Sequence, residues 1–147
     1  MARPEKIRLG EVLVQQGLIS ADDLTKSLEE QKRTGRKLGR IFVDSGYVTE
    51  TQISEALARQ LQIPFIDLQQ FNTKPDIIAK LPEAQARRFR SAVLTDKGNS
   101  YLVGMVDPTD LFAFDELARI LRKEIEVAVV QETALLQLID RNYRRTD

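Results

Sequence analysis

The residues best suited to chemistry in this sequence occur in two equivalent sets. Each set holds a basic residue, a nearby glycine and a later glutamine: Arg8, Gly10 and Gln31 in the first set, and Lys37, Gly39 and Gln60 in the second, 29 residues further on. A cation beside the first turn of a helix, where backbone N–H groups are unpaired, favours an anion such as phosphate. A glutamine amide can read a base edge or a phosphate. The pattern suggests a ligand with two equivalent halves.

Each of these residues also has a purely structural interpretation. Gly10 and Gly39 fall near the start of apolar helical patterns, where glycine costs roughly 0.5 to 1 kcal/mol relative to alanine. Either the close approach of a ligand or tight packing between helices would offset that cost. Gln31 and Gln60 could equally hydrogen-bond to water or to the chain at the end of a helix. From the residues alone, both interpretations stay open.

Asp107 is a candidate of another kind, at the end of an expected strand and directly before Pro108. In the run Asp-Pro-Thr-Asp it would be the N-cap of the next helix, with Pro108 at the first helical position. A carboxylate there could instead accept hydrogen bonds from N1–H and N2–H of guanine. The capping role is the simpler one, and one carboxylate cannot easily serve both.

Composition excludes several classes of protein. The 147 residues include no cysteine and no histidine, which removes disulfides, thiolate chemistry and the commonest general base and transition-metal ligand. Lys plus Arg and Asp plus Glu number 22 each, so the chain lacks the basic field that favours nucleic acid. The phosphate-binding loop G-x-x-x-x-G-K-[ST] is also absent from the sequence. We therefore expect a domain that is not an enzyme and holds no metal or cofactor.

Size and hydropathy indicate a soluble, globular chain. With 42% hydrophobic residues, it has material for one domain or two small subdomains that share a core. Its N-terminal run is charged where a secretory signal needs apolar residues, and no apolar run approaches the roughly 20 residues of a membrane-spanning helix. The sequence predicts a cytoplasmic location without membrane insertion.

The candidate residues lie on a duplicated unit of two helices. The copies are residues 8–31 and 37–60. Gly17 and Gly46 would end the short helices in the left-handed conformation, and Ser20 and Thr49 would begin the longer helices as N-caps. Apolar residues at helical spacing on the longer helices predict a four-helix cluster: Leu24 and Leu28, then Ile53 and Leu57.

After residue 62 the pattern changes to mixed helices and strands. We therefore expect an α+β fold, in which a tandem helical-hairpin repeat of four helices (residues 1–62) packs on a small α/β subdomain with a β-hairpin (residues 63–147). The strongest β signal is the pair of strands that flanks the turn 96–100. The expected strands are 65–68, 91–95, 101–106 and 124–130, and the expected helices are 75–81, 82–89, 111–122 and 132–144.

The duplicated motif RLGxx(L/V/I)(L/V/I)xxG(L/V/I)(L/V/I)xxxxLxxxLxxQ, with a five-residue spacer between its copies, resembles the MshEN domain. This is the N-terminal domain of type II secretion and type IV pilus assembly ATPases. The match looks closest to the mannose-sensitive haemagglutinin pilus ATPases, whose N-terminal domain is a cyclic di-GMP receptor. The motif covers residues 8–60, and the helix start after Asp107 is also similar to that family.

The second copy departs from the motif at four positions. Lys37 replaces arginine, Ile53 replaces leucine, and Phe42 and Tyr47 replace aliphatic residues. Lys37 keeps the positive charge but loses the bidentate fork of arginine, so we expect its phosphate contact to be weaker or shifted. The neighbouring Arg36 could substitute for it.

The resemblance implies a site for cyclic di-GMP on both copies. One half of the ligand would be held by Arg8, Leu9, Gly10 and Gln31, and the other half by Lys37, Leu38, Gly39 and Gln60. Leu24, Leu28, Ile53 and Leu57 would cover the guanine faces, and Asp107 would bring the second subdomain onto a guanine.

The resemblance also implies a function and partners. The chain would be a receptor domain that couples cyclic di-GMP to an ATPase domain following residue 147. It would work at the periphery of the inner membrane, with a membrane-platform protein as a further candidate partner. The rival hypothesis is a docking module that binds such a platform or a pilus partner and no nucleotide. A binder of single-stranded nucleic acid is a third hypothesis, which the neutral charge disfavours.

Overall fold

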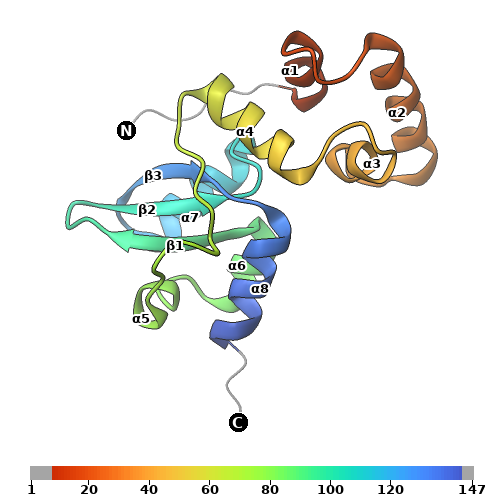
Figure 1. Cartoon of the computed structure of the whole chain (residues 1–147). Coiled ribbons are helices and arrows are strands. Elements are labelled where there is room, and N and C mark those ends of the chain that lie inside the picture. The colour runs from red at the N-terminus through yellow and green to blue at the C-terminus, as the bar shows by residue number, and fades with distance from the viewer. Residues whose placement is uncertain (1–7, 144–147) are drawn as a thin grey trace.

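The computed structural model describes residues 8–143, and within that range the chain forms eight helices and one three-stranded sheet. The expected α+β class is confirmed. The four helices of the duplicated unit (residues 9–61, the helical repeat) lie to one side of the sheet (Figure 1). Among these four helices, α4 lies nearest to the sheet. Residue 144, the expected end of the last helix, lies outside the described residues.

Each copy of the repeat forms a short helix and a longer one, as predicted. Their bounds are α1 Leu9–Gln15, α2 Ala21–Thr34, α3 Leu38–Asp44 and α4 Glu50–Leu61. Gly17 and Gly46 follow the short helices with φ of +77° and +80°, a conformation that glycine adopts without a Cβ clash. The Ser20 hydroxyl accepts a backbone N–H at the start of α2, and Thr49 forms a full capping box with Gln52. Local signals in the sequence thus determine where these helices begin and end.

The remainder of the described chain (residues 63–143, the sheet region) is built on strands β1 Ser91–Asp96, β2 Ser100–Met105 and β3 Glu124–Val129. The predicted hairpin is β1–β2, which is antiparallel, and β3 lies parallel to β2 on its other side. A parallel neighbour needs a crossover connection, and helix α7 supplies it. The helices of this region are α5 Pro75–Ile78, α6 Glu83–Phe89, α7 Leu111–Leu121 and α8 Glu132–Tyr143.

Buried apolar side chains form two main clusters and a small one between them. Leu13 and Phe42 are buried inside the helical repeat, and a larger cluster surrounds Val103 on the sheet. A third cluster joins Leu57 of α4 to Val129 of β3. The apolar contact between the two parts therefore runs through α4 and β3. The expected boundary near residue 62 falls between the main clusters, and it stays a prediction.

Two expected elements differ from the structure. The strand expected at 65–68 is a single bridge between Phe65 and Val129, because β3 ends at Val129 and no described strand lies beside the residues after Phe65. The Asp67 carboxylate then begins a turn by accepting the Gln69 N–H at 3.0 Å. The helix expected at 75–81 ends at residue 78, which agrees with the restricted backbone of residues that precede a proline, here at position 82.

The expected four-helix packing fails at one residue. Leu28 is 42% exposed on α2, whereas Leu57, its counterpart in the second copy, is 3% exposed. Leu24 and Ile53 are half-buried against the cluster inside the repeat. The reason is that α4 has β3 as a neighbour, while no described segment covers Leu28.

Candidate functional site

A cavity of about 430 Å³ opens where the helical repeat meets the sheet region. This volume lies within the range of small-molecule sites. The structure brings these predicted residues into its wall: Leu9, Gln31, Lys37, Leu38, Gly39, Ile53, Leu57 and Asp107. Most of them come from the second copy of the repeat, and Asp107 comes from the sheet region. The cavity thus joins segments that are far apart in the sequence.

The start of α3 supplies a cation and open backbone to this cavity. Lys37 is the N-cap of α3 and makes no side-chain cap, so the first-turn N–H groups lack a side-chain acceptor. Its ammonium is exposed and has no ion pair with a described residue. A Cβ placed on Gly39 would meet Leu9 Cδ2 at 3.5 Å, an ordinary contact. Packing therefore does not explain why position 39 is glycine.

The equivalent glycine of the first copy has a structural explanation. Gly10 is buried, and a Cβ built there would lie 2.4 Å from Cδ1 of Leu24. Such an approach is impossible without moving the leucine. Close packing of α1 on α2 thus accounts for Gly10, whereas for Gly39 the approach of a ligand stays a prediction.

The two glutamines differ as well. Gln31 lines the cavity, and its Nε2 donates to the carbonyl of Arg36 at 3.2 Å. This hydrogen bond to the chain is the structural alternative that the sequence had left open. Gln60 is exposed on α4 and does not line the cavity.

The other predicted residues of the first copy lie outside the cavity wall; they are Arg8, Gly10, Leu24 and Leu28. Arg36 is also outside it, with an ion pair to Glu30 at 3.1 Å and a second one to Asp44. Because two carboxylates already neutralise Arg36, nothing in the structure supports its expected use as a substitute for Lys37.

The expected N-cap role of Asp107 is wrong, and this frees its carboxylate. The cap of α7 is Asp110, which accepts the Ala113 N–H at 3.0 Å. Asp107 instead begins a turn, in which Oδ1 accepts both the N–H and the hydroxyl of Thr109. Its Oδ2 has no partner among the described residues. The choice between cap and ligand group therefore does not arise for Asp107.

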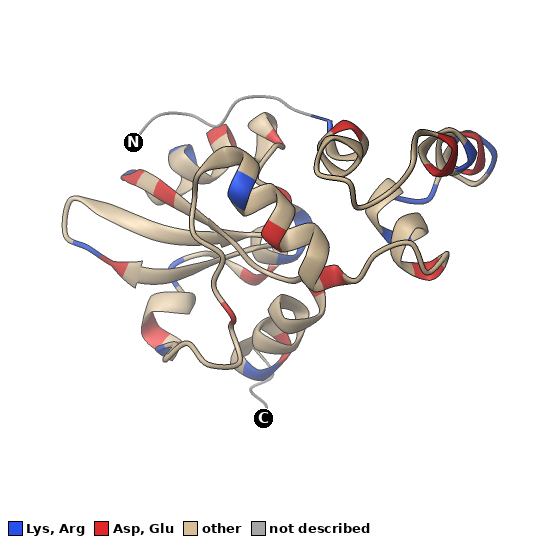
Figure 2. Ribbon diagram, turned by 45° about the horizontal axis from the view of Figure 1, so that its top comes forward, with Lys and Arg blue, Asp and Glu red and all other residues tan. Residues whose placement is uncertain are grey.

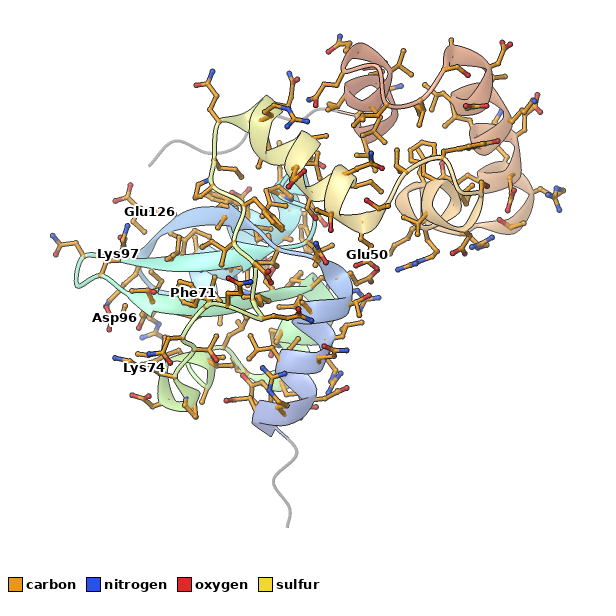
Figure 3. All side chains as sticks on the ribbon, viewed as in Figure 1. Glu50, Phe71, Lys74, Asp96, Lys97 and Glu126 are labelled. Carbon is orange, nitrogen blue, oxygen red and sulfur yellow. The ribbon has the colours of Figure 1, made fainter. Side chains whose placement is uncertain are left out.

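An ion-pair network crosses the cavity wall and links the two parts of the molecule. Arg40 of α3 donates to Glu50 of α4 at 3.1 Å and to Glu132 of α8 at 3.3 Å, and Arg90 donates to Glu132 at 2.7 Å. The hydrogen bond to Glu50 is the main cause that raises the pKa of the Arg40 guanidinium, against a smaller lowering by burial. Figure 3 shows Glu50 where α4 approaches α8.

Sequence reasoning missed six charged residues of the wall: Arg40, Glu50, Arg88, Arg90, Asp110 and Glu132. Arg88 and Arg90 stand in a short basic run that could have been noticed as a signal next to Phe89. Arg40 likewise ends the basic stretch 32–40. Glu50 and Glu132 carry no such signal, since only the fold brings them to Arg40.

The wider surface is of mixed charge. Basic and acidic residues are interspersed over both the helical repeat and the sheet region (Figure 2). Within residues 8–143, the structure holds no group of three or more acidic side chains that could hold a metal ion. None of the described helices is long and apolar enough to cross a membrane.

Comparison with protein families and sequences shows the MshEN domain family and finds pilus assembly ATPases among the relatives of the chain. The family model described as the MshEN domain matches residues 61–147. The type IV pilus assembly ATPase PilB of Myxococcus xanthus is 35% identical over 136 residues, which is 92% of this chain and 24% of that protein. PilB of Thermus thermophilus is 31% identical over an alignment that covers 99% of this chain and 20% of that protein. The chain thus spans at most about a quarter of these relatives.

Solved structures give the same fold. The structure of MshE with cdg (cyclic di-GMP) superposes with a TM-score of 0.82 and 38% identity, covering 94% of this chain and all of that one. The N-terminal domain of XpsE superposes with a TM-score of 0.76 at 21% identity, covering 91% of this chain and 92% of that one. The likeness to XpsE shows the fold alone.

Proposed function

The chain belongs to the MshEN domain family, and from this premise we propose that it is a receptor domain that binds cyclic di-GMP. It would couple that ligand to an ATPase domain of a pilus or secretion machine at the inner membrane. The structure of MshE with cdg, at 38% identity over 94% of this chain, supports the choice of ligand. The proposed contacts are Asp107 and these residues of the two motif copies: Arg8, Leu9, Gly10, Leu24, Leu28 and Gln31, and Lys37, Leu38, Gly39, Ile53, Leu57 and Gln60.

The observation that carries the proposal is the cavity between the helical repeat and the sheet region. It combines Lys37, which makes no ion pair with residues 8–143, a glycine at position 39 that packing does not require, and an Asp107 carboxylate oxygen that has no hydrogen bond within that range. A phosphate is suited to the first two, and a guanine Watson–Crick edge is suited to the third. Cyclic di-GMP contains both groups.

The two copies would hold the two halves of the ligand. In the second copy, Ile53 and Leu57 present apolar surface to the cavity, where a guanine face could lie. In the first copy, Leu28 is exposed and Leu24 is half-buried, and Arg8 at the N-cap of α1 has no side-chain cap and is exposed. The second guanine would cover the exposed leucine of the first copy and so lie partly outside the cavity.

The proposed regulation is positional. A ligand that contacts both the helical repeat and Asp107 favours the arrangement in which those contacts form, and only to the extent of its preference for that arrangement. The Arg40–Glu132 ion pair already bridges the same junction. The orientation of the sheet region relative to the repeat would then be the signal passed to the ATPase domain.

The test is a calorimetric titration of the chain with cyclic di-GMP, GTP and cyclic GMP. We expect saturable binding of cyclic di-GMP and much weaker binding of the two mononucleotides, because each offers only one base. Absence of heat with cyclic di-GMP at micromolar protein would favour the docking module instead. In the full-length protein, an ATPase rate unchanged by saturating ligand would contradict the coupling.

A further inference from the structure

Three arginines line the cavity, and only one of them lacks a carboxylate partner. Arg40 is paired with Glu50 and Glu132, and Arg90 is paired with Glu132. Arg88 makes no ion pair with a described residue, although it lies in the same wall. The hydrogen bond from Arg119 is the main cause that lowers the pKa of Glu116, and the charge of Arg88 adds to this without forming an ion pair. A guanidinium that makes no ion pair at the wall of a cavity can donate to a ligand.

Aromatic rings hold the Arg88 side chain in place. Its guanidinium lies over the ring of Phe89, 5.0 Å from the centroid, and over that of Phe112 at 5.8 Å. The two rings contact each other edge to face at 6.2 Å. Stacking uses the faces of the guanidinium and leaves its N–H edge free to donate. This arrangement also gives a role to Phe112, which is 58% exposed.

Arg88 and Asp107 line the cavity from segments that adjoin each other. Strands β1 and β2 pair Ser91 with Met105, and the same pairing continues one step further, where the Val106 N–H donates to the Arg90 carbonyl at 3.1 Å. The segment that precedes β1 therefore runs beside the segment that follows β2. Arg88 and Asp107 both line the cavity from these adjoining segments.

We infer that Arg88 is a base-reading residue that works with Asp107 on one guanine. Arg88 would donate to O6 and N7, the bidentate contact by which arginine recognises guanine, while Asp107 accepts from the N1–H and N2–H groups. Adenine has an amino group where guanine has O6, so it would oppose the arginine and leave Asp107 without its donors. This inference rests on the proposed function, and it makes the sheet region the source of base specificity.

A phosphate contact by Arg88 is the alternative that the experiment must separate. Lys37 and Arg8 already provide one cation for each phosphate of the proposed ligand. A phosphate contact would not depend on the base, whereas a base contact must respond to changes in the atoms of guanine.

The experiment combines protein and ligand changes in one cycle. Wild type, Arg88→Ala and Arg87→Ala are titrated with cyclic di-GMP and with its analogue in which 7-deazaguanine replaces both guanines. Arg87 is the matched control, because it is adjacent on α6 and pairs with Glu83 and Asp140 outside the cavity wall. Thermal unfolding of each variant without ligand checks that the fold is intact.

We expect Arg88→Ala to weaken binding of cyclic di-GMP roughly 10- to 100-fold, the scale of one bidentate base contact, with Arg87→Ala near wild type. The 7-deazaguanine analogue, which lacks N7, should bind wild type about tenfold more weakly than cyclic di-GMP does, and should bind Arg88→Ala almost as well as cyclic di-GMP does. An equal loss of affinity for the analogue in the two proteins would overturn the base contact and indicate a phosphate contact. Wild-type affinity in Arg88→Ala would overturn the inference alone, while a wild-type chain that binds no cyclic di-GMP would overturn the proposed function with it.

A second variant tests the same inference by gain of affinity. Glutamine pairs with N6 and N7 of adenine as arginine pairs with guanine. Arg88→Gln should therefore narrow the preference for cyclic di-GMP over cyclic di-AMP by at least tenfold relative to wild type. An unchanged preference would count against base reading, even if Arg88→Gln lowered both affinities.

Discussion

The two copies of the repeat have the same local structure and different surroundings. Each forms a short helix, a glycine turn and a longer helix. The second copy packs against the sheet region, so Leu57 is buried and Gly39 lines the cavity. In the first copy the equivalent Leu28 is exposed, and Gly10 is buried beneath Leu24. Equivalent side chains of the two copies thus have different neighbours.

A position in the motif therefore does not determine the role of the residue that occupies it. The glycine two residues into each short helix allows close packing in one copy and leaves room at a cavity in the other. Which role a residue takes depends on the segment that lies beside it. In the described chain the main contact of the repeat with the sheet region is made by the second copy, through α4 and β3. Substitutions at equivalent positions should therefore give unequal results.

The largest difference between the copies is expected in the stability of variants at the equivalent leucines. Leu57→Ala should lower the free energy of unfolding by about 2 to 4 kcal/mol, because it empties a buried position between α4 and β3. Leu28→Ala should cost less than about 1 kcal/mol, since that side chain is already partly in water. Urea denaturation of the two variants without ligand measures both values. Similar losses would show that the surroundings of the two copies are alike.

The next inequality concerns ligand affinity. Arg8→Ala should weaken binding of cyclic di-GMP by about 1.5 to 3 kcal/mol, the scale of a charge-assisted hydrogen bond. Lys37→Ala should fall at the lower end of that range, because a lysine contacts phosphate as a point charge without the arginine fork. Calorimetry gives both numbers.

The same titration tests whether both copies bind. Lys37→Arg, which restores the motif of the first copy, should tighten binding. Wild-type affinity in Arg8→Ala would remove Arg8 from the site and leave the second copy as the sole anion contact of the repeat.

The smallest expected difference between the copies is in the stability of the two glycine variants, where the change in the free energy of unfolding should not have the same sign. Gly10→Ala should destabilise the fold by about 1 kcal/mol, since the new methyl displaces Leu24. Gly39→Ala should be neutral or stabilise by up to about 0.5 kcal/mol, because alanine fits there and favours the helix. Thermal unfolding measures both. If both variants lost stability equally, Gly39 would have a packing role that its contacts do not indicate.

Elements set by neighbouring residues could be predicted from the sequence. Gly17, Gly46, Ser20 and Thr49 act through backbone atoms within a few residues, and they end and begin the helices where expected. The β1–β2 hairpin likewise follows from its turn. These signals need no knowledge of the fold, because the interactions that they describe are local.

The features that could not be predicted depend on distant segments. Asp107 and Asp110 are both suitable caps by sequence, and only the path of the chain selects Asp110. Periodicity gives Leu28 and Leu57 the same apolar stripe and does not say which one is covered. Arg40 and Glu132 are 92 residues apart, and no local pattern relates them.

The Arg40–Glu132 pair also bears on how the molecule assembles. Contacts within each helical hairpin join segments close in sequence, whereas Arg40 and Glu132 are 92 residues apart, and contacts of long sequence separation incur a larger loop-closure cost. We therefore expect docking of the repeat on the sheet region to be a late step in folding, and the cavity to form only with it. A ligand bound there would stabilise the docked state by mass action, by about 2.7 kcal/mol at a concentration 100 times its Kd. The folded chain would therefore resist unfolding most strongly when the ligand is abundant and occupies the cavity.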